Sequence, residues 1–99
     1  MIRGTTPTHT FKIPFPVSSV KEAMVIYAQD DIEVFHKDTV DCAMKDNEIS
    51  VTLTQEDTLL LNHQMPVQVQ LRLLTTKGVA MASSVKVVSV KKCLNNEVL

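Results

Sequence analysis

Three histidines and two cysteines are the side chains of this sequence best suited to hold a metal ion. They are His9, His36, His63, Cys42 and Cys93, and no two of them have the short spacing of a local zinc-binding pair. Each histidine falls in a different predicted element, where it is expected to be a solvated side chain. The sequence therefore predicts no metal site and no cofactor.

The cysteines are also the strongest nucleophiles in the chain. Cys42 lies on the apolar side of an alternating segment, where burial raises the pKa of a thiol and makes it unreactive. Cys93 is expected to be more exposed, and only Lys91 and Lys92 are placed to lower its pKa. The first ten residues lack the hydrophobic block of a signal peptide, so both thiols are expected to be reduced, with a Cys42–Cys93 disulfide as the open alternative.

Other catalytic patterns are missing from the sequence. Its serines occur in strand and turn contexts, without a nucleophile-elbow motif. The pairs Asp30–Asp31 and Glu56–Asp57 could be imagined as glycosidase carboxylates, but such residues far more often form turns and helix caps. The chain has only two glycines, Gly4 and Gly78, and so no glycine-rich phosphate loop. We predict that the protein is not an enzyme.

Composition and charge restrict the partners. Ten basic and eleven acidic residues give a formal net charge of −1, with no basic run longer than Lys91–Lys92. Nucleic-acid binding needs clustered positive charge, so no nucleic-acid partner is expected. No apolar stretch approaches the roughly 20 residues of a membrane helix, so no membrane partner is expected either. With 44% hydrophobic residues, the 99-residue chain can form the core of one domain.

Alternation of apolar and polar residues is the strongest structural pattern. Residues 40–45, 48–53 and 67–73 alternate, which is typical of antiparallel strands with one buried face. Composition predicts further strands, which are 6–13, 23–29, 32–37 and 79–90. The segment 23–29 is apolar on both faces and is expected at a central position. In the last segment the apolar phase slips, and a β-bulge or a change of sheet near Val87 would explain the slip.

Turns and short helices separate these strands. Asp30–Asp31, Asp46–Asn47 and residues 75–78 are predicted turns, with a positive φ at Gly78. One helical turn is predicted within residues 18–22. A second is predicted after Thr54, which would cap it together with Asp57 and bring Leu59 or Leu61 to the base of the core.

The predicted fold class is all-β. We expect a two-sheet antiparallel immunoglobulin-like β-sandwich with seven to eight strands and one or two short helical turns, because turn signals recur about every 8 to 12 residues. It forms a single domain over residues 1–99, in which residues 1–5 and 94–99 are expected to be flexible tails.

Candidate binding residues come from strand edges and misplaced leucines. The threonine-rich residues 5–10 and the long segment 79–90 are expected to be edge strands, whose unpaired N–H and C=O groups can accept a partner strand. Leu60, Leu61 and Leu74 fall where alternation would place polar residues; they either contact a partner or cover the ends of the sandwich. The candidate partner-binding residues are Thr6, Thr8, Thr10, Leu60 and Leu74.

Several short motifs carry a family resemblance. The opening MIRGTTPT leads into FKIPF, the middle contains VTLTQEDT, and QLRLLT and Gly78 follow. Nearly the whole chain resembles a family of short structural proteins of phages and prophages of Firmicutes, similar to the immunoglobulin-like N-terminal domain of phage baseplate upper proteins. The resemblance implies a non-enzymatic virion structural or assembly module, with no catalytic residues. Baseplate upper proteins continue into fibre or receptor-binding regions, so this chain, which stops at Leu99, is expected to be the docking module without the arm.

The resemblance also implies partners and a location. The partners are other virion structural proteins, a homo-oligomer is a further expectation, and the location is the virion, or the bacterial cytoplasm during assembly. The alternative is a host-encoded immunoglobulin-like binding domain of unknown ligand, which would need an export signal. A small enzyme or metal protein is a third class, distinguishable by metal analysis and by a cavity with convergent polar groups.

Overall fold

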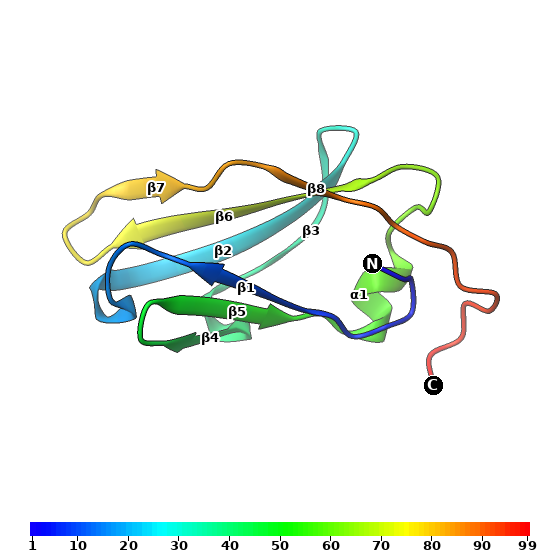
Figure 1. Ribbon diagram of the computed structural model, residues 1–99, viewed down its shortest axis with the longest axis horizontal. Helices are drawn as coiled ribbons and strands as arrows, with labels where there is room; N and C mark the ends of the chain where they lie inside the picture. The colour runs from blue at the N-terminus through cyan, green and yellow to red at the C-terminus, as the bar shows by residue number, and fades with distance from the viewer.

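Two antiparallel sheets stack face to face in the computed structural model, which describes all residues 1–99 (Figure 1). The eight strands are β1 (Thr8–Lys12), β2 (Val20–Gln29), β3 (Ile32–Lys37), β4 (Cys42–Lys45), β5 (Glu48–Thr52), β6 (Val67–Thr75), β7 (Ala80–Ala82) and β8 (Lys86–Val88). The helical elements are the α-helix α1 (Gln55–Leu59) and the 3₁₀ turns η1 (Val17–Ser19) and η2 (Thr39–Asp41). The predicted class, an all-β sandwich with short helical turns, is confirmed.

The strands are ordered as in an immunoglobulin-like sandwich, but one strand of that fold is missing. One sheet has the order β1-β5-β4, and the other has β3-β2-β6, with β7 and β8 both paired to β6. These positions correspond to strands B-E-D and C′-C-F-G of the immunoglobulin fold. The strand that would pair with the outer side of β1, strand A of that fold, is not among the eight. β1 is therefore an edge strand, as predicted for residues 5–10.

The core lies between the sheets and follows the alternation of the sequence. Its 14 buried residues are Phe11, Ile13, Ala23, Val25, Tyr27, Ile49, Val51, Leu53, Leu61, Val67, Val69, Leu71, Leu73 and Val90. Full burial of one such aliphatic side chain contributes about 1.5–3 kcal/mol. Leu61, which is 1% exposed, closes the base of the core after α1, whereas Leu59 is only half-buried.

The turns predicted from single residues are present. Asp30 and Asp31 have φ angles of 54° and 61° and join β2 to β3, and Asp46 has a φ of 54° between β4 and β5. Gly78 has a φ of 82° in the turn after β6. At α1 the Asp57 N–H donates to the Thr54 hydroxyl oxygen (3.1 Å), which confirms the capping box.

The prediction that Val40 lies on the apolar face of a strand is wrong. Val40 is 93% exposed in η2, and β4 starts only at Cys42. The carboxylates of Asp38 and Asp41 form a reciprocal capping box around this turn, with the Asp38 N–H donating to Asp41 (3.1 Å). These local side-chain hydrogen bonds compete with strand pairing and wind the chain into a 3₁₀ turn.

The long last segment is interrupted just before Lys86 and Val87, by a β-bulge and not by a change of sheet. Ser83 donates its N–H to Leu71 O (2.8 Å), and Lys86 lies opposite Val69. The chain therefore advances three residues from Ser83 to Lys86 while β6 advances only two, from Leu71 to Val69. One extra residue is therefore accommodated between Ser83 and Lys86, as in a β-bulge. The bulge divides the segment into β7 and β8, and both remain at the edge of the same sheet.

Both ends of the chain contact the sandwich. Ile2 forms a parallel bridge with Lys91, and hydrogen bonds run from Arg3 N to Lys91 O (3.0 Å) and from Lys91 N to Met1 O (2.8 Å). The backbone N–H and C=O of Leu99 bond to the Gln55 side chain at 2.7 and 3.2 Å. The segments expected as tails are thus held by these contacts at residues 1–3 and 99.

Candidate partner-binding edges

The outer edge of β1 is the first candidate surface. Hydrogen bonds from Leu53 N to Pro7 O and from Ile13 N to Asn47 O, both 2.9 Å, show that odd-numbered residues of this segment bond toward β5. In an antiparallel pair the intervening residues direct their backbone groups away from the partner. The N–H and C=O groups that face outward, free to pair with another strand, belong to Thr8, Thr10 and Lys12.

Threonine hydroxyls cover the outer face of this edge. The Thr8 hydroxyl lies 2.8 Å from that of Thr52, and the Thr10 hydroxyl lies 3.1 Å from that of Ser50. All the paired side chains are on the solvent side of the three-stranded sheet, so the pairs make this face polar. Thr6 is exposed too, but it precedes β1 and is outside the ladder.

The two predicted leucines lie outside β1. Leu60 is 61% exposed directly after α1. Leu74 is half-buried on β6, where it lines a shallow pocket with Val40 and Ala80. Of the five predicted partner-binding residues, only Thr8 and Thr10 therefore share one surface, and all five stay predictions.

The β7–β8 edge, which lies within the segment 79–90 predicted as an edge strand, is the second candidate surface. Exposed apolar side chains are concentrated there: Met81 is 43% exposed and Val87 is 65% exposed, and Val79 and Val85 lie between these values. Met81 lies opposite Leu73 on the core side of the sheet, and Val87 lies opposite Gln68 on the solvent side. Exposed apolar side chains along a strand edge mark an interaction surface. The signal in the sequence was the slip in apolar phase, which the bulge between Ser83 and Lys86 explains.

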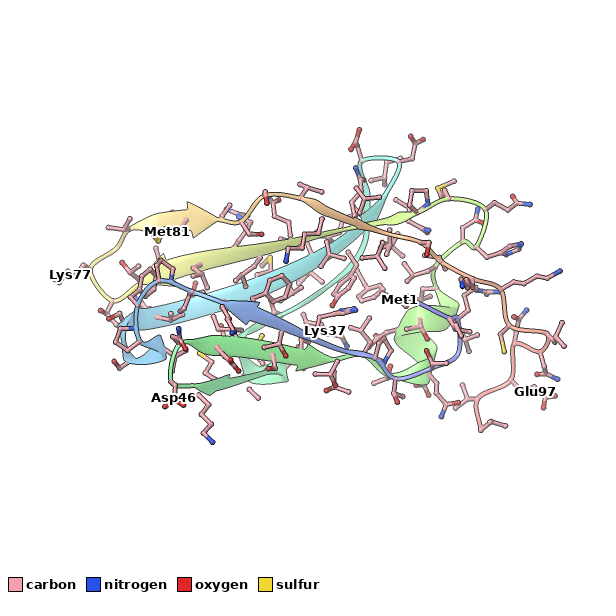
Figure 2. The ribbon with its side chains drawn as sticks, in the orientation of Figure 1. Met1, Lys37, Asp46, Lys77, Met81 and Glu97 are labelled. Atoms are coloured by element: carbon pink, nitrogen blue, oxygen red, sulfur yellow. The ribbon has the colours of Figure 1, made fainter.

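An apolar groove separates these two edges. It has a volume of about 670 Å³ and is lined by Thr10, Phe11, Lys12, Ile13, Pro14, Phe15, Leu71, Leu73, Met81, Ala82, Ser83 and Lys86. Figure 1 shows β7 and β6 beyond the upper edge of the three-stranded sheet, with no strand in front of them. Met81 lies at the β7 side of the molecule in Figure 2. The groove occupies the place where strand A of an immunoglobulin domain would run.

A polar contact crosses the core behind β1. The Nδ1 atom of His9 lies 2.6 Å from the hydroxyl oxygen of Tyr27, and the Tyr27 ring stacks on Phe35 with centroids 4.8 Å apart. Burial, together with the positive N-terminus, lowers the pKa of His9. Burial first, and then the nearby Cys42 and Asp57, raise the pKa of Tyr27. These shifts favour the neutral imidazole and the protonated phenol, and the tautomer of His9 decides which of the two donates the hydrogen bond.

An ion pair links the sheet to the helix. The Lys37 ammonium lies 2.6 Å from an Asp57 carboxylate oxygen, and the side chains are only 17% and 15% exposed. Burial alone would raise the pKa of Asp57, but the contacts with Lys37 and Thr54 outweigh burial and lower it. Lys37 projects into the interior in Figure 2. Asp57 thus serves as a helix cap and an ion-pair partner, in line with the predicted capping role.

Both cysteines are free in the structure, and their reduced state stays a prediction. Cys42 is half-buried, and its Sγ lies 3.4 Å from Asp38 O. Burial raises the pKa of Cys42, and the carboxylates of Asp41 and Asp38 add to the effect. These surroundings disfavour the thiolate at Cys42.

The residues considered for metal binding lie apart. His36 contacts Glu33 (3.2 Å) and Asp38 (3.5 Å), His9 contacts Tyr27, and His63 is exposed in the loop before β6. No group of three or more His, Cys, Asp or Glu side chains is arranged to hold a metal ion. The acidic pairs Asp30–Asp31 and Glu56–Asp57 lie in a hairpin turn and in the first turn of α1, as predicted.

Comparison with other proteins adds no relative: no protein-family model, no curated protein and no solved structure matches the chain. None of its helices has the length and hydropathy of a membrane-spanning helix. Fold and edges together define the class as an immunoglobulin-like β-sandwich in which β1 and β7–β8 border an open apolar groove.

Proposed function

We propose that this protein is a non-enzymatic structural or assembly module of a phage or prophage virion, of the baseplate or tail type, which binds other virion proteins through its strand edges. The observation that carries the proposal is the set of exposed apolar side chains along the β7–β8 edge, Val79, Met81, Val85 and Val87, which lie on both faces of that edge. The virion setting rests on the resemblance of the sequence to small phage structural proteins.

The physical reason for a protein partner is the combination of free backbone groups and apolar surface. Backbone N–H and C=O groups of an edge strand are satisfied by another strand, which gives geometry and affinity. Apolar side chains beside that edge add burial of about 25 cal/mol per Å². A second polypeptide supplies both at once, and the β7–β8 edge offers both.

The experiment that tests this proposal asks whether the protein is present in purified virions. Virions released from an induced host that carries the gene are purified and their proteins are quantified by mass spectrometry. We expect a fixed copy number per particle, because virion layers use repeated copies. Absence of the chain from purified particles, or an exported product of a host gene cluster, would contradict the proposal and favour the host-encoded binding domain.

A matched pair of variants tests the edge. The double variant M81K/V87K places charges on the β7–β8 edge, and I32K/L94K places charges on exposed apolar residues elsewhere. When each gene complements a deletion, incorporation of M81K/V87K into particles is expected to drop by about tenfold or more, whereas I32K/L94K is incorporated normally. Equal incorporation of the two variants would show that the edge is not the contact.

A further inference from the structure

We propose that the groove between β1 and the β7–β8 edge, here termed the seam, binds an extended segment of a different protein that adds as a parallel strand to β8 and β7. Alternate apolar side chains of that segment fill the groove over Leu71 and Leu73, and an acidic side chain meets Lys12 or Lys86. This inference rests on the proposed function and names the chemistry of the segment that the edges bind.

The first step is the row of outward backbone groups along β7 and β8. Hydrogen bonds from Thr75 N to Val79 O (2.9 Å) and from Ser83 N to Leu71 O (2.8 Å) show that odd-numbered residues of β6 bond toward this edge. In β8, Lys86 and Val88 lie opposite the odd-numbered Val69 and Val67. The residues between these bonded pairs face outward. They are Ala80, Ala82, Val87, Ser89 and Lys91.

The second step is that part of this row already carries a parallel strand. The Met1 amine donates to Ser89 O (2.9 Å), and Lys91 bonds to Met1 and Arg3 through its N–H and C=O. The outward-facing C=O of Ser89 and the N–H and C=O of Lys91 are therefore already hydrogen-bonded. The outward-facing backbone groups of Ala80, Ala82 and Val87 are not. The edge thus accepts a parallel strand where Met1–Arg3 provide one, and the same row continues unpaired along the seam.

The third step is the shape and polarity of the groove. Its floor is apolar, formed by Leu71 and Leu73, with Phe11 and Met81 on the two sides. A β-strand directs every second side chain to the same face, so a segment with apolar residues at alternate positions matches this floor. Eight or nine residues, about 30 Å of extended chain, cover the length of β7 and β8.

The fourth step is charge. Lys12 and Lys86 line the groove from its two sides, and neither takes part in any of the three ion pairs of the structure. Lys86 lies opposite the buried Val69, on the inward side of the edge. An inward lysine on an edge strand opposes indiscriminate pairing. It favours a segment that carries a carboxylate at that point.

The test uses an extension of the full chain as the probe. Because Met1 packs against the core and Ile2 is exposed, residues at the second, fourth, sixth and eighth positions before Met1 are in phase with the groove. A Val-Thr dipeptide repeated four times before Met1 places valines at these positions. The control is Thr-Val repeated four times, which has the same composition and directs its valines to solvent.

Amide hydrogen exchange gives the decisive measurement. With the in-phase extension, the amides of Ala82 and Val87 are expected to exchange about tenfold or more slowly than with the control, and the Tm is expected to be about 4–8 °C higher. Exchange rates within about twofold in the two proteins would overturn the proposal. That result would say nothing about whether the chain is present in virions, so the proposed function and this inference can be contradicted independently.

Two further measurements test the acidic residue and the identity of the occupant. In the in-phase extension, the valine nearest Lys86 is replaced by Glu or by Lys; the Glu version is expected to melt about 2 °C or more above the Lys version at low salt, and K86A is expected to abolish the difference. Equal melting would overturn the charge requirement. If the unextended chain dimerises and thereby protects the amides of Ala82 and Val87, the occupant is a second copy, and the proposal of a different protein is overturned.

Discussion

His9 on β1 and Tyr27 on β2 are joined across the core by a contact of 2.6 Å between Nδ1 and the phenolic oxygen. The two residues belong to different sheets, so this contact ties the three-stranded sheet to the five-stranded one. It is flanked by the Tyr27–Phe35 stack, which holds the phenol in place. The exposed edge strand β1 is therefore anchored from its inner side.

Removal of the phenolic hydroxyl should destabilise the sandwich without unfolding it. The substitution Tyr27→Phe leaves the half-buried His9 Nδ1 without its partner, and we expect the free energy of unfolding to fall by about 1–2 kcal/mol. Urea unfolding followed by far-UV circular dichroism measures the change. Thr10→Val, which removes a hydroxyl from the solvent side of β1, is the control and should cost less than about 0.5 kcal/mol. Equal effects would mean that the buried contact contributes nothing.

His9 should also make stability depend on pH. Burial lowers its pKa below the ordinary 6.5, so the unfolded chain binds a proton at a higher pH than the folded chain does. The contribution of His9 to the free energy of unfolding is then fully present above about pH 7 and falls as pH drops through 6.5 toward the folded-state pKa. Asp57, whose pKa is lowered, loses its contribution only at more acidic pH, below its ordinary 3.8.

Urea titrations at about pH 7.5, 6.5 and 5.5 separate this contribution. His9→Gln is expected to flatten the slope between these pH values, whereas His36→Gln, at an exposed histidine, should keep the part that His9 causes. Parallel profiles for wild type and His9→Gln would show that another group titrates.

The Lys37–Asp57 pair should show strong energetic coupling. Both side chains are mostly buried, so removing either one leaves the other charge without its partner. A double-mutant cycle with Lys37→Met and Asp57→Asn is expected to give a coupling energy of about 1–3 kcal/mol. The exposed Glu33–His36 pair is the reference and should give less than about 0.5 kcal/mol. Additive single effects at Lys37 and Asp57 would contradict the expectation.

Lys86 should keep the β7–β8 edge from pairing with itself. Replacing this inward lysine by valine removes the charge that opposes edge-to-edge association. Lys86→Val is expected to form larger species as the protein concentration rises, as measured by light scattering after gel filtration. Lys92→Val, a change of the same kind beyond β8, should behave like the wild type. A monodisperse Lys86→Val protein would show that the bulge alone protects the edge.

The sequence allowed prediction of those features that depend on neighbouring residues. The left-handed Asp30 and Asp31, the turn at Gly78 and the Thr54–Asp57 capping box each involve groups a few positions apart. Their conformations follow from φ preferences and from side-chain reach, so residue types suffice to predict them. The one local failure, at Val40, had a local cause, because two aspartates cap a 3₁₀ turn there.

Features that depend on distant residues could not be predicted. The contact of His9 with Tyr27, the ion pair of Lys37 with Asp57, and the parallel bridge of Ile2 with Lys91 all require knowledge of which strands are neighbours. Periodicity assigns each side chain to a face but not each strand to a partner. For the same reason the sequence indicated two edge strands without showing that they border a common groove.

Tyr27 is the only tyrosine, and the chain contains no tryptophan. Its ring is fully buried and stacked on Phe35. Aromatic absorption and emission near 280–305 nm, about the range of a phenol, therefore report on a single site at the contact between the two layers. A change in that signal during refolding would therefore measure when the two sheets pack together, without any introduced label.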